Sequence, residues 1–367
     1  MNAIVNFRIA FFGLCLLGMV SCRKDAPVGD PYGYDNTPYQ LEIPLQNGWT
    51  TFPIPDDNPM TQAGVALGKK LFYEPLLSAN KQQSCASCHN PEFAFSDNGK
   101  DFSVGITGQK GVRNAPALFN LAWADKYNLS PHRYFWDGGA NDLERQAVGP
   151  ITNPIEMASS LNEVMRKLQQ HPEYPKLFRK AFGSDSITTS KLVKAIAQFE
   201  RTLISANSPY DKAERRQRQR TLSEYNGMTI FVTETKGDCF HCHGNLSSPY
   251  FTDFSMQNNG LDQVFSDSGL ARITGKPEDL GKFKVPSLRN LAFTAPYMHD
   301  GRFKTLMEVI DFYNSGTKNS PGVSPFISKH FPNGGLNLLP QEKIDLFNFL
   351  ISLSDTDFVK NPKFKKN

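Results

Sequence analysis

The chain has no cysteine to spare for disulfide bonds. Of its six cysteines, four belong to two short repeated motifs, and the other two, Cys15 and Cys22, lie near the N-terminus. A fold held together by disulfides is therefore excluded. The chain also lacks a strong charge imbalance, because 40 Lys and Arg residues stand against 36 Asp and Glu residues, for a net charge of +4. We therefore expect no nucleic-acid partner.

The N-terminus lacks an apolar run long enough to cross a bilayer. The run from Ile9 to Val20 is too short to span, so residues 1–21 are predicted to be an export signal. Cys22 then resembles the lipidated first residue of a bacterial lipoprotein, which predicts a periplasmic or cell-envelope protein anchored to a membrane at Cys22. Ordinary cleavage near Ser21, giving a soluble periplasmic protein, is the alternative.

Strict alternation of apolar and polar residues is scarce, and helical signals take its place. Ser160 with Glu163 and Thr305 with Glu308 have the spacing of capping boxes, and Pro340 is typical of a helix start. Apolar residues recur at helical spacing in four sets: Leu161, Val164 and Leu168; Leu192, Ile196, Phe199 and Leu203; Leu306, Val309, Ile310 and Tyr313; and Ile344, Phe347 and Ile351. These signals predict an all-α protein with long loops.

Two copies of the pattern Cys-x-x-Cys-His are the most specific feature of the sequence. The first consists of Cys85, Cys88 and His89, and the second of Cys239, Cys242 and His243. Two thiols at this spacing add to the vinyl groups of haem, and the adjacent histidine supplies a nitrogen to the iron. The motifs therefore predict two covalent haem c groups. A structural zinc site would use the four thiols but leaves both histidines unexplained.

An internal repeat surrounds the two motifs. The stretch from Gly68 to Phe72 is matched by the stretch from Gly227 to Phe231, each shortly before its haem motif. Two further matches follow in the same order: Pro116–Ala122 with Pro286–Ala292, and Trp136–Gly138 with His299–Gly301. Three matches in one order predict a duplicated module with one haem in each copy.

The repeat and the composition give a domain plan of two cytochrome c-like haem domains related by internal duplication. The segments are a lipoprotein-type signal peptide at 1–21, a proline-rich tether at 22–59, an N-terminal domain with the first haem at 60–206, a linker at 207–221, and a C-terminal domain with the second haem at 222–357. Basic residues cluster at 212–220 and 360–366. A solvated linker and a frayed terminus explain these clusters, and docking of an acidic redox partner is the alternative.

A family resemblance extends from about Met60 to about Asp355. The blocks that carry it are Cys85–His89, Arg113–Ala117, Phe135–Gly138, Leu143–Ala147, Gly149–Met157, Val285–Asn290 and Thr294–Gly301. Together they resemble the bacterial di-haem cytochrome c peroxidase and MauG family. The resemblance implies an oxidoreductase that reduces hydrogen peroxide at the N-terminal haem with electrons relayed from the C-terminal haem.

The resemblance also implies catalytic residues in the first copy. Glu156 and Gln146 match the family positions that move a proton during O–O cleavage and orient the peroxide. In the second copy an apolar residue, Ile310, stands at the position of Gln146. Trp136 matches the family tryptophan between the haems, where an indole relays an electron. Its counterpart His299 receives no firm role.

A calcium ion is implied as a further cofactor. Asn114, Thr294 and Pro296 match family positions that bind Ca²⁺ through oxygen atoms. One ligand comes from the first copy and two come from the second. The ion is therefore expected to hold the two haem domains together.

Two departures from the usual peroxidase pattern concern the iron ligands. Between Asn90 and Pro131 the chain has no His and no Met, so the first haem is expected to be open to peroxide without prior reduction. The second haem of such peroxidases usually has a Met ligand, and Tyr313 stands at that position here, as in MauG. Since no nearby Met competes, we expect Tyr313 to bind the second iron. A core tyrosine with its hydroxyl bonded elsewhere is the alternative.

Three functions are consistent with these features. The first is a peroxidase that uses hydrogen peroxide and takes electrons from a small redox protein or another donor. The second is a MauG-like maturase that oxidises side chains of a protein substrate. The third, a plain di-haem electron carrier, is disfavoured because a carrier has no use for Gln146 and Glu156 beside an open iron.

Overall fold

The computed structural model describes residues 30–97, 99–127, 131–132 and 134–366. Helices and loops make up nearly all of this part, which confirms the predicted all-α class. Two short strands, β1 (Met256–Gln257) and β2 (Phe283–Lys284), pair antiparallel. No helix among the described residues has the length and apolar character needed to cross a membrane. The predicted signal peptide and the lipidation site at Cys22 lie outside the described residues.

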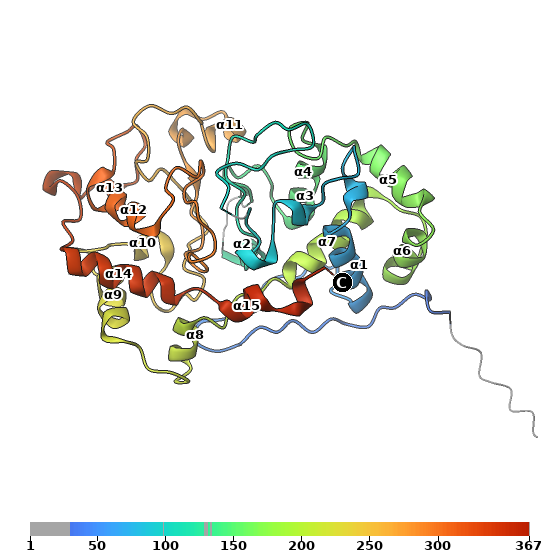
Figure 1. The fold of residues 1–367 in the computed structure, drawn as a ribbon, viewed down its shortest axis with the longest axis horizontal. Coiled ribbons are helices and arrows are strands. Elements are labelled where there is room, and N and C mark those ends of the chain that lie inside the picture. The colour runs from blue at the N-terminus through green and yellow to red at the C-terminus, as the bar shows by residue number, and fades with distance from the viewer. Residues whose placement is uncertain (1–29, 98, 128–130, 133, 367) are drawn as a thin grey trace, which may run out of the picture.

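The first and second halves of the chain lie side by side (Figure 1). The α-helices of the first half are α1 (Gln62–Phe72), α2 (Ala124–Tyr127), α3 (Leu143–Gln146), α4 (Val148–Thr152), α5 (Leu161–Gln170), α6 (Tyr174–Phe182) and α7 (Thr189–Arg201). Those that follow are α8 (Pro209–Glu214), α9 (Leu222–Val232), α10 (Phe240–His243), α11 (Ala271–Thr274), α12 (Leu306–Asp311), α13 (Pro325–Ser328), α14 (Pro340–Ser352) and α15 (Thr356–Lys360). Single helical turns are η1 (Pro75–Leu77), η2 (Cys85–Ser87), η3 (Pro91–Phe93), η4 (Leu121–Trp123), η5 (Pro277–Asp279), η6 (Phe312–Gly316), η7 (Phe331–Asn333) and η8 (Pro362–Phe364).

Each half is built on one pair of closely packed helices, α1 with α7 and α9 with α14. A glycine permits the close approach in both pairs. A Cβ atom added to Gly68 would lie 1.9 Å from the carbonyl oxygen of Ala195, and one added to Gly227 would lie 2.0 Å from that of Asp345. Because both glycines belong to the matched stretches of the sequence repeat, the two pairs are equivalent.

The matched loops also adopt the same backbone conformation. Asn120 and its counterpart Asn290 both have positive φ values, 54° and 63°, and their side chains both bond Ser205. Isolated bridges join Tyr134 to Ala140 in the first half and Tyr297 to Phe303 in the second. These parallels support the internal duplication that the sequence predicts.

The four predicted helical faces pack against the core except at one residue of the last, since Phe347 and Ile351 do so but Ile344 does not. Ser160 and Thr305 cap α5 and α12 through their side chains, and the apolar faces of α5, α7 and α12 face the core. On α14, however, Ile344 is 46% exposed, and the buried residues include Leu346 and Phe349. The close contact with α9 through Gly227 fixes which face of α14 is inside.

The segment at 30–59 is not a free tether. It runs along one edge of both halves (Figure 1), and its aromatic residues Trp49 and Phe52 are buried. Trp49 packs edge-on against Trp123 of the first half and Tyr250 of the second, with 5.2 Å between ring centroids in each pair. The expectation from proline content was wrong here because a few buried aromatic rings are sufficient to hold an extended segment in place.

The predicted solvated linker and frayed C-terminus are also ordered. Within the linker, Asp211 forms a buried ion pair with Arg289, at 2.7 Å. At the C-terminus, Phe358 and Phe364 pack against Phe95 of the first half. The last residues therefore cross back from the second half to the first, which a basic composition alone does not reveal.

Candidate functional site

The two haem motifs present their histidines in the same way. His89 follows η2, and its Nδ1 lies 2.8 Å from the carbonyl oxygen of Phe95. His243 ends α10, and its Nδ1 lies 3.3 Å from the carbonyl oxygen of Phe251. Both phenylalanines have positive φ values, 62° and 51°, which turn these carbonyl groups toward the rings. A hydrogen bond at Nδ1 leaves Nε2 to bind iron, as in most histidine metal ligands.

Burial keeps both imidazoles in the form that binds metal. It lowers the pKa of His89, and it lowers the pKa of His243 to about 4, so both rings are neutral at physiological pH. None of the four motif cysteines forms a disulfide bond. Among the described residues, Glu234, Asp238 and His241 lie close enough together to bind one metal ion. The four thiols do not come together there, which argues against the zinc alternative.

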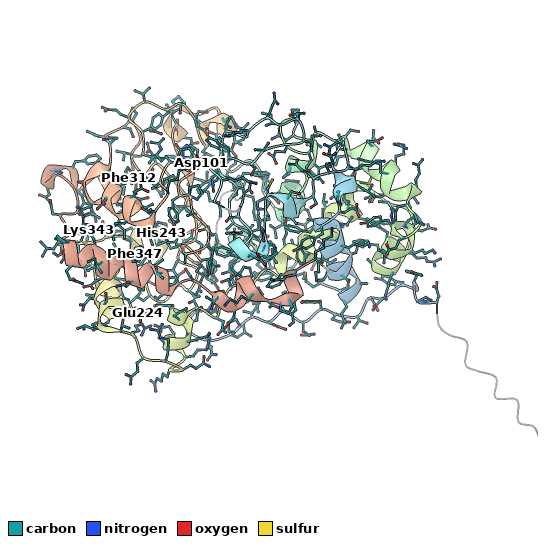
Figure 2. All side chains as sticks on the ribbon, in the orientation of Figure 1. Asp101, Glu224, His243, Phe312, Lys343 and Phe347 are labelled. Carbon is teal, nitrogen blue, oxygen red and sulfur yellow. The ribbon has the colours of Figure 1, made fainter. Side chains whose placement is uncertain are left out.

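A cavity of about 290 Å³ adjoins the second motif and extends to the boundary between the halves. Figure 2 shows the position of His243 in the second half. Cys239, Cys242 and His243 line it together with many apolar side chains, including Leu291 and Leu350. Thiols, a neutral imidazole and an apolar wall suit a covalently attached porphyrin, so these residues fit the predicted haem.

Glu156 and Gln146 both lie in the first half, close to each other along the chain. Gln146 is the last residue of α3, is buried, and lines the cavity. Glu156 follows α4, and its Oε1 accepts a hydrogen bond of 2.7 Å from Asn153 Nδ2. Burial raises the pKa of Glu156 and outweighs this hydrogen bond, which lowers it. The Glu156 carboxylate is also among the charges that, after burial itself, raise the pKa of the Cys85 thiol, so it lies near the first motif.

The loop after the first motif rests on the Glu156 backbone. The amide of Ile106 donates a hydrogen bond of 3.0 Å to the carbonyl oxygen of Glu156. A Cβ atom on Gly105 would lie 1.5 Å from the carbonyl oxygen of Ile155, so only glycine fits there. The loop therefore supports the Glu156 turn without bringing a His or Met side chain to the first haem.

Trp136 is fixed at both its backbone and its ring. Its indole Nε1 donates a hydrogen bond of 2.8 Å to the carbonyl oxygen of Asn114, and its own carbonyl oxygen accepts one of 2.8 Å from the amide of Lys284 in the second half. The counterpart His299 is buried and stacks on Phe283, with 3.7 Å between ring centroids. The carbonyl oxygen of His299 accepts from the amide of Asn114 at 2.7 Å. Asn114 thus links the two equivalent positions.

Ion pairs near these residues join the first half of the chain to the second. Arg113 of the first half binds Asp267 of the second at 2.7 Å and Asp137 of its own half at 2.6 Å. Arg272 of the second half also pairs with Asp137. Asp101, labelled in Figure 2, pairs with Lys304 across the same boundary. Such a network fixes the relative position of the halves.

The three predicted calcium ligands line the same cavity. Asn114 from the first half and Thr294 and Pro296 from the second are all part of its wall. The side-chain amide of Asn114 donates to the carbonyl oxygens of Lys100 and Asp101, at 3.0 and 3.3 Å. No described group donates to its Oδ1, which therefore retains its acceptor sites for a cation.

Tyr313 lies in η6, a π-helical turn that continues α12, and lines the cavity with His243. Turns of this type are frequent at functional sites. Asn259 Nδ2 lies 3.1 Å from the Tyr313 hydroxyl, and burial raises the pKa of that hydroxyl to about 12. The same amide lies 3.7 Å from the sulfur of Met298, which also lines the cavity. The expectation that no methionine lies near Tyr313 was therefore wrong, since the loop at 294–301 brings Met298 there.

Comparisons with known proteins identify the family. A family model described as di-haem cytochrome c peroxidase matches residues 62–219. The methylamine utilization protein MauG of Methylorubrum extorquens is 37% identical over 82% of this chain and 81% of its own length. The cytochrome c551 peroxidase of Nitrosomonas europaea is 37% identical over 71% of this chain and 75% of its own.

A solved structure is similar over nearly its full length. This is a MauG-like protein associated with microbial copper homeostasis, with 34% sequence identity and a TM-score of 0.79, covering 89% of this chain and 99% of that one. The sequence relatives and this structure agree with the two haem motifs and the helical fold. The chain therefore belongs to the di-haem cytochrome c peroxidase family, and is an oxidoreductase that binds two haem c groups.

Proposed function

We propose that this oxidoreductase cleaves hydrogen peroxide at its first haem, held by Cys85, Cys88 and His89. The observation that carries the proposal is the partly buried carboxyl of Glu156 near the first motif, with Gln146 buried in the same half. When bound, the first haem supplies the iron that receives peroxide and stores its oxidising equivalents. An electron carrier needs neither side chain.

Glu156 is proposed to move the proton. The outer peroxide oxygen leaves as water only after it receives a proton, and a carboxyl at the distal face can take one from the inner oxygen and give it to the outer one. Burial raises the pKa of Glu156 toward the working pH, where such transfer is most efficient. The Gln146 amide donates a hydrogen bond that orients the peroxide.

Trp136 is proposed to relay charge between the halves. Its hydrogen bonds to Asn114 and Lys284 hold the indole at the boundary, and its π system offers a path for an electron or a hole. Tyr313 is proposed to hold the iron of the second haem together with His243, since both line the same cavity. An anionic phenolate would stabilise oxidised iron there.

A calcium ion at Asn114, Thr294 and Pro296 is part of the proposal. The support is that oxygen-bearing groups of both halves line one cavity, beside the carbonyl group that holds Trp136. The proposal also includes export, because haem c is attached outside the cytoplasm, and lipidation at Cys22.

A MauG-like activity, the oxidation of side chains on a partner protein, is the second candidate. Tyr313 at the position of the usual methionine favours it, as does similarity to two proteins named as MauG or MauG-like. Turnover of peroxide with a small redox protein as donor supports the peroxidase. Peroxide-dependent modification of a co-purified protein, without such turnover, supports the maturase.

The substitution Glu156→Gln tests the peroxide chemistry. The amide keeps the size of the side chain but cannot carry the proton, so we expect peroxide cleavage to fall by about 10²-fold or more with both haems retained. Glu92→Gln is the matched control, because Glu92 lies in the same half with its side chain 61% exposed. Peroxide cleavage by Glu156→Gln at the rate of the control would refute the assignment.

A further inference from the structure

Lys284 is a cation in the cavity wall without an anionic partner. It ends β2, is partly buried, and places its Nζ 5.9 Å from the ring centroid of Phe254. Among the described residues, no carboxylate forms an ion pair with it. By contrast, Arg289 in the same wall is paired with Asp211. Burial lowers the pKa of Lys284 to about 8, which reflects a charge removed from water without compensation.

The position of Lys284 connects the second haem to the relay. Pro286, two residues further along the chain, lines the cavity together with His243. The amide of Lys284 itself donates to the carbonyl oxygen of Trp136. Lys284 thus lies in the wall of the cavity that both His243 and Trp136 line.

Comparison of the two repeat copies shows that the positive charge of Lys284 is present in only one of them. When Pro116 and Pro286 are matched, Lys284 occupies the position of Asn114. The first half therefore has a neutral amide where the second half has an ammonium group. A charge introduced into only one copy suggests a role specific to one haem.

We propose that Lys284 is the counter-ion of a propionate of the second haem and raises the reduction potential of that haem. Haem carries propionate carboxylates, and a buried ammonium group is stable only when it is paired. A positive charge beside the porphyrin disfavours the more positive, oxidised iron and thus favours reduction. Lys284 is a positioning residue here, since it acts through the propionate. The inference rests on the family cofactor and not on the peroxide chemistry.

The test is the reduction potential of each haem in the full-length loaded protein, measured by spectroelectrochemistry for Lys284→Met, Lys284→Arg and Lys282→Met. We expect the potential of the second haem to shift negative in Lys284→Met and to stay near wild type in Lys284→Arg. Lys282→Met is the matched control, because Lys282 lies two residues away and its charge is already paired with Asp279, at 3.0 Å. It should leave both potentials unchanged.

Resonance Raman spectra give a second measurement that is independent of turnover. The propionate bending band of the second haem should change in Lys284→Met and not in Lys282→Met. If Lys284→Met fails to load haem while Lys284→Arg loads both, the need for a cation supports the inference. Unchanged potentials and an unchanged band in a fully loaded Lys284→Met, or a shift confined to the first haem, would overturn it. These outcomes leave the role of Glu156 unaffected.

Discussion

Replacing Trp49 by alanine should destabilise the whole molecule, because this residue joins the N-terminal segment to both halves. The side chain is 5% exposed and packs edge-on against Trp123 and Tyr250. The Arg289 guanidinium lies 4.9 Å from the centroid of its ring. Truncation of such a buried aromatic costs about 3–5 kcal/mol, to which lost aromatic pairs contribute about 0.5–1.5 kcal/mol each. We therefore expect a loss of about 4 kcal/mol in the free energy of unfolding.

Denaturant unfolding of the loaded protein, followed by circular dichroism, measures this loss. Tyr34→Ala is the control, because Tyr34 lies in the same segment and is 60% exposed, so its truncation should cost little. Trp49→Phe should retain most of the stability. Tyr250 directly precedes Phe251, whose carbonyl group bonds His243, so Trp49→Ala should also disturb the second haem spectrum. A loss below about 1 kcal/mol in Trp49→Ala would refute the reasoning, since it falls outside the range for a buried aromatic.

Two further predictions concern ligands. In Tyr313→Phe, electron paramagnetic resonance of the ferric protein should no longer show the low-spin signal of a haem held by His243 and Tyr313. The control Met298→Leu should leave that signal intact. A signal that persists in Tyr313→Phe would exclude phenolate ligation. Elemental analysis should find calcium that chelators remove. Asn114→Ala should bind less calcium, because it deletes the free Oδ1 but keeps the backbone carbonyl that holds Trp136. Equal calcium contents in this variant and in the wild type would count against the site.

Local signals in the sequence predicted local structure well. The haem attachment residues follow from the motif itself, because thioether chemistry requires both thiols and the histidine within a few residues. The caps at Ser160 and Thr305 were predicted correctly, because a cap depends on residues three positions apart. The matched landmarks predicted a duplicated module, and the positive φ values shared by Asn120 and Asn290 support it.

Features that depend on contacts between distant segments were missed or wrong. The exposed position of Ile344 follows from how α14 meets α9, which periodicity does not specify. Met298 approaches Tyr313 only through the fold of the loop at 294–301. Lys284 became visible as an unpaired cation only when its surroundings were known, although its mismatch with Asn114 in the repeat was a signal that could have drawn attention to it.

The central claim is that the first haem is open at rest and that Glu156 serves it. Stopped-flow mixing of the resting ferric protein with hydrogen peroxide, without any prior reduction, tests this most directly. The account predicts an immediate change in the haem spectrum in the wild type and in Glu92→Gln, slowed by about 10²-fold or more in Glu156→Gln. A wild-type protein that reacts with peroxide only after its second haem has been reduced would contradict it.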